Sequence, residues 1–415
     1  MRMIDGARGQ AWRGIFRRAL LAALLVVPLA AHDDGAAHRA VTPAVGTPVP
    51  VAGQYDYAGL LHLHTALSDD ATGDYDQLAR LAAANGLAFL IVTDHNTFGA
   101  GRAGEGRRHG VLMLTGMEAS RPEGHLLAMG SERAPTDPKT STDAFLATVR
   151  SEDGMSVLAH PTHRKWRWEG PLDDRIDGLE IIDLADLFYA SSTGDKVATV
   201  AALGVVGPTA YLRLSARPDE ALRMWDAVGS RRRFVGVYAP DIHQAVELWE
   251  GAKLPFPPAD QIMRLARNHI LVDHPLSGDL IADRAAVLDA LKAGRVYVGL
   301  DILGDAGGFR FTARTGKTTA RMGMEIPVEG ETAFEVRSPS AAAALEATIR
   351  LLRDGVVVAQ STPGASTLRY GDRRPGVYRV EVVVPRKSAP QAPGETIWIY
   401  SNPIYLRASG ILRGS

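Results

Sequence analysis

The stretch Gly59-Leu-Leu-His-Leu-His64 combines a short apolar run with two histidines near its end. Apolar runs of this length, bounded by polar segments, predict a buried β-strand. Successive side chains of a strand point to opposite faces, so His62 and His64 are expected on one face. Two imidazoles on one face could bind one metal ion together. An isolated His-x-His motif, however, is more often a pair of surface or core residues.

Similar apolar segments occupy residues 88–94, 111–115, 156–159, 178–182 and 234–238. Between the first two strands, residues 75–84 have the apolar spacing of an amphipathic helix, and Asn85-Gly86 supplies a C-cap. Alternation of strands and helices predicts a parallel sheet or an α/β barrel over residues 54–300.

From residue 301 onward the pattern changes to short strands that follow one another without intervening helices. These strands are expected at residues 309–313, 333–337, 347–352, 356–359, 376–384 and 396–400. Turn pairs such as Asp354-Gly355 and Pro375-Gly376 separate several of them. The predicted architecture is therefore an α/β domain followed by a C-terminal all-β sandwich over residues 301–415.

The first residues are typical of a secretory signal peptide. Arg13, Arg17 and Arg18 precede an uncharged apolar run, residues 19–31, that ends in two alanines. A bilayer-spanning helix needs about 20 apolar residues, so this run is too short to remain as an anchor. We expect cleavage near Ala31, a linker over residues 32–53, and a periplasmic or secreted mature protein without stable membrane insertion.

The composition is that of an ordinary globular protein. Of the 415 residues 46% are hydrophobic and 22% charged, and 46 lysines and arginines balance 47 aspartates and glutamates. This balance speaks against a nucleic-acid-binding protein. Because the chain has no cysteine, disulfides, thiol nucleophiles and iron–sulfur clusters are excluded. Any metal must be bound by histidine, aspartate and glutamate.

Further histidines and carboxylates follow the predicted strands. They are Asp69, His95 in Thr93-Asp94-His95, Glu118, His125, His160, and Asp241 with His243 in Asp241-Ile-His243. Active sites of α/β barrels gather at the carboxyl ends of the strands. The combination therefore favours a common metal centre, whereas each motif alone is typical of a turn or a helix cap.

In this order, these motifs resemble the ligand motifs of the PHP (polymerase and histidinol phosphatase) superfamily of metal-dependent hydrolases. The resemblance covers residues 56–300. The signal sequence, the C-terminal β domain and the ending Ser401-Asn-Pro-Ile-Tyr405 resemble the CehA/McbA-like branch. The resemblance implies a distorted (β/α)7 barrel that holds two to three divalent ions of zinc, manganese or iron.

The resemblance also implies which residues bind which ion. It assigns His62, His64, Glu118 and Asp241 to the first ion, Asp69, His95 and His243 to the second, and Glu118, His125 and His160 to the third. The expected catalytic residues are His62, His64, Asp241 and His243, as ligands of ions that activate water. The expected reaction is hydrolysis of a small-molecule ester by a metal-bridged hydroxide.

The residues expected to bind the substrate lie close to these ligands in the sequence. Arg164 and Lys165 alternate with tryptophans in the loop after His160, which predicts either an anion or ring clamp or a solvated loop packed against the rim. Arg121 is a second candidate for binding an anion. Glu180 is expected to pack or to orient a ligand. Asp94 is expected either to accept a hydrogen bond from a ligand imidazole or to form a turn.

Three functions remain open from the sequence. A phosphomonoesterase or phosphodiesterase is the first, because the PHP resemblance most commonly implies phosphoesters. Hydrolysis of a carboxylic or carbamate ester, or of an amide, is the alternative that the CehA/McbA-like features imply. A binding module with structural metals is the non-enzymatic alternative. An arginine clamp would favour the phosphoester, and an apolar aromatic pocket would favour the neutral ester.

Overall fold

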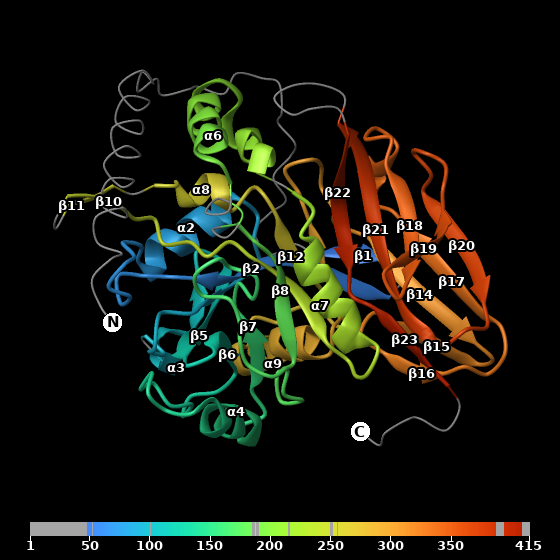
Figure 1. The fold of residues 1–415 in the computed structure, drawn as a ribbon, viewed down its shortest axis with the longest axis horizontal. Coiled ribbons are helices and arrows are strands. Elements are labelled where there is room, and N and C mark those ends of the chain that lie inside the picture. Colours follow the sequence, from blue (N-terminus) through green and yellow to red (C-terminus); the bar gives the residue numbers. More distant parts are fainter. Residues whose placement is uncertain are drawn as a thin grey trace.

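The computed structural model describes residues 48–408 apart from residues 52, 100, 185–186, 188–190, 215, 250–251, 255 and 387–393. The predicted signal peptide and nearly all of the predicted linker lie outside the described residues. The end of the predicted linker forms strand β1 (Val49–Val51), which pairs antiparallel with β2 (Gln54–Leu63). The described chain is mixed α/β, as the alternation of patterns predicts (Figure 1).

The first part of the chain, residues 54–300, contains a continuous sheet. After β2 come β3 (Phe89–Val92), β5 (Val111–Arg121), β6 (Gly124–Met129), β7 (Met155–Leu158), β8 (Gly178–Asp183) and β9 (Val235–Ala239). Neighbours pair parallel from β2 to β5, antiparallel from β5 to β7, and parallel again from β7 to β9. A parallel bridge between Leu63 and Ile242 then brings the end of β9 beside the end of β2.

The first long helix of this part ends at Asn85, where the sequence predicts a C-cap. Helix α2 (Tyr75–Ala84) begins after Asp74, whose side chain accepts hydrogen bonds from two backbone N–H groups of the first turn. Its buried residues are Leu78, Ala79 and Ala82, one face of the helix. The other helices are α3 (Gly101–Gly104), α4 (Thr142–Ser151), α6 (Thr193–Val206), α7 (Asp219–Gly229), α8 (Ala259–Ile262) and α9 (Leu280–Lys292), with the 3-10 helices η1 (Gly207–Leu214) and η2 (Ser340–Ala342).

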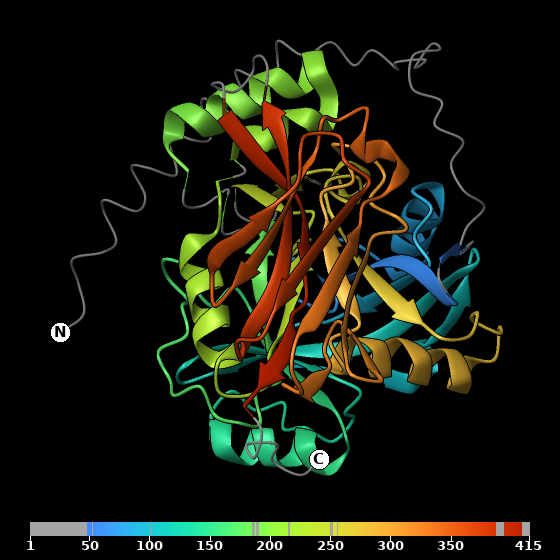
Figure 2. The ribbon, with the colours of Figure 1, turned by 90° about the vertical axis from the view of Figure 1, so that its right-hand side faces the viewer.

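The strands of the C-terminal part belong to two sheets, one of which continues into the preceding part of the chain. One contains β14 (Arg310–Thr315), β15 (Thr318–Arg321), β17 (Thr332–Arg337) and β20 (Thr367–Asp372). The other contains β16 (Glu325–Pro327), β18 (Thr348–Arg353), β19 (Val356–Gln360), β21 (Gly376–Arg386), β22 (Gly394–Ser401) and β23 (Ile404–Arg407). Figure 2 shows these strands from the side. Phe334 of the first sheet stacks on Tyr378 of the second, with ring centroids 4.3 Å apart.

The two parts of the chain are joined through their sheets. Strand β13 (Val296–Gly299) pairs with β22, and β12 (Arg267–Val272) pairs with both β13 and β2. The Asn402 side chain, in the Ser401–Tyr405 ending, donates hydrogen bonds to the carbonyl oxygens of Gly236 and Val296 at 2.7 and 2.9 Å. The predicted division at residue 300 therefore follows the end of β13, yet the hydrogen-bonded sheet continues across it.

The sequence left several strands unpredicted. Among them are β6, β4 (Gly106–Arg108) and the hairpin of β10 (Val246–Trp249) with β11 (Ala252–Leu254). Strand β6 continues from β5 through a tight turn at residues 122–123, for which Pro122 and Gly124 were the available signal. No helix in the described part of the chain has both the length and the apolar character needed to cross a bilayer.

Candidate metal centre

The candidate site lies where the strands of the first part end, and its backbone is strained. Three of the residues expected as ligands have a positive φ: His62 at 63°, His160 at 30° and Asp241 at 48°. Residues other than glycine rarely adopt this region, because it brings the Cβ atom into close contact with the backbone. At His62 the pairing of β2 with β3 also shifts register. Such strain is common at functional sites, where an unfavourable backbone conformation is tolerated because it directs the side chains toward one point.

The first group joins His62 and His64 with Glu118 and Asp241. The Nε2 atoms of both histidines lie 3.2–3.3 Å from Glu118 Oε2 and 3.2 Å from Asp241 Oδ1. All four atoms are buried and make no hydrogen bond to the described residues. Ligands bound to one ion at about 2.0–2.1 Å in tetrahedral geometry lie about 3.3 Å apart. The group therefore fits a divalent cation, which would satisfy all four atoms together.

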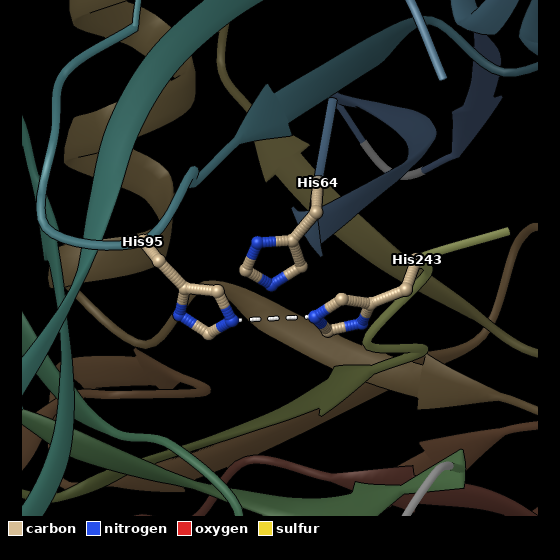
Figure 3. Close-up of side chains that lie close together, drawn as sticks. All are labelled: His64, His95 and His243. Carbon is tan, nitrogen blue, oxygen red and sulfur yellow. Dashed lines mark hydrogen bonds between the residues drawn. The ribbon is translucent and has the colours of Figure 1, made fainter. Parts of the chain in front are cut away.

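The second group contains His64, His95 and His243, which converge from three different segments (Figure 3). The Nε2 atoms of His95 and His243 are 3.3 Å apart, and both face Asp70 Oδ2 at 3.3 and 3.4 Å. Two ring nitrogens this close share at most one proton between them, whereas a metal ion would accept a lone pair from each.

The geometry adds a neighbouring aspartate to the candidates for the second group. The sequence assigns Asp69 to this group, which stays a prediction, and its equally exposed neighbour Asp70 faces His95 and His243. Both aspartates lie in the turn after β2, and the direction of each side chain depends on the path of that turn. The acidic pair Asp69-Asp70 was the available signal, and spacing within one loop does not decide between its two members.

The third group is built on the other oxygen of Glu118. Glu118 Oε1 lies 2.7 Å from His125 Nδ1 and 2.9 Å from His160 Nε2. The two oxygens of this carboxylate thus serve different groups, as in a carboxylate that bridges two ions. The structure brings together the residues expected for the first and third ions, and their binding of ions stays a prediction.

The charges of the site alter the pKa values of its residues. Burial lowers the pKa of His62, but neighbouring carboxylates, first that of Glu180, outweigh burial and raise the pKa well above its usual value. Burial also opposes protonation of His95, whereas the neighbouring carboxylates of Asp70 and Glu118 raise its pKa to about 10. The carboxylates therefore stabilise positive charge at this place, and a divalent cation would supply that charge in place of protons.

A second layer of side chains orients the candidate ligands. Glu180 Oε1 lies 2.6 Å from His62 Nδ1, and Glu180 Oε2 accepts a hydrogen bond from the backbone N–H of His160 at 2.6 Å. The pairing places the His62 proton on Nδ1 and leaves Nε2 directed at the first group. Glu180 therefore orients a ligand, which is one of the two roles that the sequence left open for it.

Asp94 supports the site in a different way from the one expected. It accepts hydrogen bonds from the hydroxyl groups of Thr65 and Ser68, at 2.8 and 2.9 Å, and from the backbone N–H of Thr65. The Ser68 oxygen lies 3.2 Å from His64 Nδ1 and accepts from the backbone N–H of His95. Asp94 thus acts on the imidazoles through Ser68, and sequence reasoning missed Ser68 because serines have no distinguishing pattern in such a turn.

A cavity of about 460 Å³ opens beside the three groups. Its lining includes seven of the candidate ligand residues together with Ser120, His163 and Gln244. Apolar and aromatic residues complete much of the lining, among them Trp166, Leu184, Tyr211, Leu214, Phe256, Pro257 and Ile262. No lysine or arginine is among the described residues that line the cavity.

The residues expected to bind an anionic substrate lie elsewhere. Arg121 is buried, donates hydrogen bonds to the backbone carbonyls of Pro135 and Asp137, and stacks over the Phe145 ring at 4.4 Å. These contacts hold Arg121 in a structural position, and anion binding by it stays a prediction. Arg164 and Lys165 are exposed and do not line the cavity, and the Lys165 ammonium lies 4.4 Å from the centre of the Trp166 ring.

Trp166 is the residue of this loop that reaches the cavity wall. Its ring stacks on His163 with centroids 4.6 Å apart, and His163 Nδ1 accepts hydrogen bonds from the backbone N–H groups of Lys165 and Trp166. Trp168 instead packs in the core. The loop thus places one aromatic side chain at the cavity and directs its cations to solvent.

Comparison with known proteins finds no matching family model and no match among curated proteins. Among solved structures, the chain is similar to a two-domain protein containing a predicted PHP-like metal-dependent phosphoesterase from Bacteroides vulgatus. That match has 13% identity, covers 88% of this chain and 99% of that chain, and has a TM-score of 0.41. An amidohydrolase from Chromobacterium violaceum, solved with bound sulfate and no metal, matches at 16% identity over 45% of this chain and 87% of its own, with a TM-score of 0.28.

A third similarity is to the soluble domain of PmoD from Methylocystis, at 15% identity over 23% of this chain and 90% of that one, with a TM-score of 0.17. All three TM-scores are below 0.5, so the case for this protein's function rests on its own residues. Those residues define a mixed α/β protein with a buried cluster of histidines and carboxylates suited to divalent metal ions.

Proposed function

We propose that this protein is a metal-dependent hydrolase with a centre of two to three divalent ions. The observation that carries the proposal is the set of four buried ligand atoms on His62, His64, Glu118 and Asp241. Divalent ions held there supply Lewis acidity, which activates water and polarises an ester group. Mixed imidazole and carboxylate ligands suit zinc, manganese or ferrous iron.

The fold proposed for this hydrolase is the distorted (β/α)7 barrel of the PHP superfamily with a C-terminal β-sandwich. The order of strands β2 to β9 and the bridge between Leu63 and Ile242 support a closed barrel over residues 54–300. The stacking of Phe334 on Tyr378 between two sheets supports a sandwich over residues 301–415.

For the substrate we propose an uncharged small-molecule ester, of the carboxylic or carbamate type. Many residues that line the cavity are apolar or aromatic, and no lysine or arginine is among its described lining residues. A phosphate group usually recruits arginine or lysine in addition to metal ions. This lining therefore favours the alternative that the CehA/McbA-like features implied, with amides of similar shape as related substrates.

A phosphoester is the second candidate, and one observation favours it. The two oxygens of Glu118 face separate ligand groups, an arrangement that suits adjacent ions. Adjacent ions can together neutralise a phosphoryl group without a protein cation.

The test combines metal analysis with hydrolysis assays on the full chain. After loading with zinc, manganese or ferrous iron, metal content is measured by elemental mass spectrometry. Hydrolysis is measured with 1-naphthyl acetate, a naphthyl carbamate, p-nitrophenyl phosphate and bis-p-nitrophenyl phosphate, with His64→Ala as the control variant. We expect two or three equivalents of metal, turnover of a naphthyl ester, and no turnover by the control.

Other outcomes would overturn parts of the proposal. Turnover of a phosphate ester alone would replace the neutral ester by the phosphoester. Metal without turnover of any probe, or no metal after loading, would favour a binding module.

For location and partners we propose export to the periplasm or beyond, a small-molecule partner and no nucleic acid. The balanced charge of the chain and the apolar run at residues 19–31 support this proposal. Amino-terminal sequencing of the protein recovered from a secreting host tests it, with a new terminus near residue 32 as the expected result. An intact terminus in the cytoplasmic fraction would contradict export.

A further inference from the structure

Ser120 lies at the cavity wall beside the candidate ligands but belongs to none of their groups. It follows Glu118 by two residues on β5, so both side chains face the cavity. Its cross-strand partner on β6 is His125, a member of the third group. A ligand seated at that group would therefore have the Ser120 hydroxyl next to it.

Asn96 fixes the orientation of this hydroxyl. The Asn96 Oδ1 atom accepts a hydrogen bond from the backbone N–H of Ser120 at 2.9 Å, and its Nδ2 atom donates to Ser120 Oγ at 3.2 Å. Only the oxygen of an amide can accept from a backbone N–H, so the direction of the amide is determined by its partners. Asn96 is itself held by its backbone N–H, which donates to the Glu118 carbonyl at 2.8 Å, and its φ is 51°.

The hydroxyl of Ser120 therefore has its proton available. A serine hydroxyl has one proton and two lone pairs, and Asn96 Nδ2 occupies a lone pair. No described residue accepts the Ser120 hydroxyl proton in a hydrogen bond, and the side chain is only partly buried. The proton can therefore point into the cavity, as a neutral donor beside the third ligand group.

We infer that Ser120 Oγ donates a hydrogen bond to an oxygen of the substrate, and that Asn96 is the positioning residue that keeps the hydroxyl in this direction. This inference rests on the proposed hydrolase function. The donor is uncharged and fits the carbonyl or alkoxy oxygen of a neutral ester. Ser120 thus provides a neutral hydrogen-bond donor for substrate recognition next to the third ligand group.

The test is a double-mutant cycle between Ser120→Ala and Asn96→Asp in the metal-loaded full chain, with 1-naphthyl acetate as the probe. Ser120→Ala removes the donor, and we expect kcat/KM to fall about tenfold with unchanged metal content. Asn96→Asp still accepts from the Ser120 N–H, but its carboxylate would also accept the hydroxyl proton and turn it away from the cavity. We expect a similar loss in this variant.

The non-additivity of the two substitutions in kcat/KM distinguishes a reoriented Ser120 hydroxyl from an effect of the added aspartate charge. In the Ser120→Ala background no hydroxyl remains to be turned, so Asn96→Asp should lower kcat/KM by a clearly smaller factor than in the Ser120 background. Ser120→Thr keeps the hydroxyl and should keep kcat/KM within about threefold of the wild type.

Several results would overturn the inference. These are an unchanged kcat/KM in Ser120→Ala, strictly multiplicative effects in the cycle, or loss of metal in Ser120→Ala, which would make the serine a structural support. A wild-type protein that turns over none of the ester probes would instead refute the proposed function, so the two failures are distinguishable.

Discussion

At the scale of single residues, Asp69 and Asp70 differ in what they face although they are adjacent. Asp70 lies 3.3–3.4 Å from two imidazoles of the second group, and those imidazoles hold its pKa well below the usual value against the opposing effect of burial. We therefore predict that Asp70→Ala binds about one metal equivalent less and loses activity by a factor of about 100 or more. Elemental mass spectrometry and ester hydrolysis would measure both effects.

Asp69→Ala is the matched control for this prediction. It removes a carboxylate from the preceding residue of the same turn, which is exposed like Asp70. We expect metal content and activity close to those of the wild type. Loss of metal in Asp69→Ala with retention in Asp70→Ala would support the ligand assignment made from the sequence.

Glu180 shows how one residue outside the ligand groups can set the geometry of two ligands. It pairs with His62 Nδ1 and accepts from the backbone N–H of His160. In Glu180→Gln one of these contacts is lost, because the amide nitrogen cannot accept a hydrogen bond. We predict a 10–100-fold weaker metal affinity, measured by competition with a chelator.

Glu220→Gln is a suitable control for Glu180→Gln. Glu220 is half-exposed and pairs with Arg167 at 2.6 Å, away from the ligand groups. It should leave metal affinity unchanged. Equal affinities in Glu180→Gln and the wild type would mean that Glu180, on β8, serves only to pack the interior.

At the scale of elements, helix α7 is attached to strand β21 by a buried ion pair. Arg379 is 1% exposed and donates to both carboxylate oxygens of Asp226 at 2.8 and 2.9 Å. Asp226→Ala would leave the guanidinium buried with only Glu381, at 2.6 Å, to balance it. We predict a loss of about 3 kcal/mol in the free energy of unfolding, measured by denaturant titration.

An exposed ion pair provides the comparison. Glu220→Ala removes the partner of Arg167, whose side chain is 48% exposed, and should change the free energy of unfolding by about 1 kcal/mol or less. Equal losses in the two variants would contradict the importance of burial at the α7–β21 junction.

At the scale of the whole molecule, His269 lies in a buried charge network where the two parts of the chain meet. Its ring nitrogens face Asp56 at 3.1 Å and Asp301 at 3.2 Å, and Arg310, at the start of β14, lies 3.1 Å from Asp56. Burial lowers the pKa of His269, but the charges of Asp301 and Asp56 outweigh it and raise the pKa to about 10.

This raised pKa predicts a pH-dependent stability. Since a histidine in the unfolded chain has a pKa of about 6.5, the stabilisation by protonated His269 is fully present below that pH. It declines as the pH rises from about 6.5 and is lost as the pH passes about 10. We expect the wild type to exceed His269→Gln in free energy of unfolding at pH 6, and this difference to shrink toward pH 10.

Denaturant titrations of both proteins at pH 6, 8 and 10 would measure this difference. Subtracting the variant's free energy of unfolding from that of the wild type cancels the contributions of other titrating groups. A difference that is independent of pH would show that His269 is neutral in the folded protein. In that case His269 would contribute to the network only through hydrogen bonds of a neutral imidazole, beside the ion pair of Arg310 with Asp56.

Much of the fold was accessible from the sequence because it is encoded locally. The helix at residues 75–84 has an apolar period that matches its buried face, and the strands at residues 88–94 and 376–384 are apolar runs that are almost continuously buried. All three elements are present with ends within two residues of those predicted. Histidines and carboxylates at strand ends also predicted which residues gather at the site. Residue type and period determine these features within a few neighbouring positions.

Tertiary structure alone decided which atoms meet. The approach of Asp70 to two imidazoles, the burial of Arg121 on Phe145, and the direction of the Ser120 hydroxyl depend on partners distant in sequence or on the path of a turn. The pairing of β13 with β22, which joins the two parts of the chain, likewise involves residues about a hundred positions apart. The sequence by itself determined the chemical groups available and the elements that carry them, because both are local properties. The distances between these groups, and which of their atoms are left without a hydrogen-bond partner, follow from packing of the whole chain. Only long-range contacts fix the backbone angles and side-chain directions at strand ends.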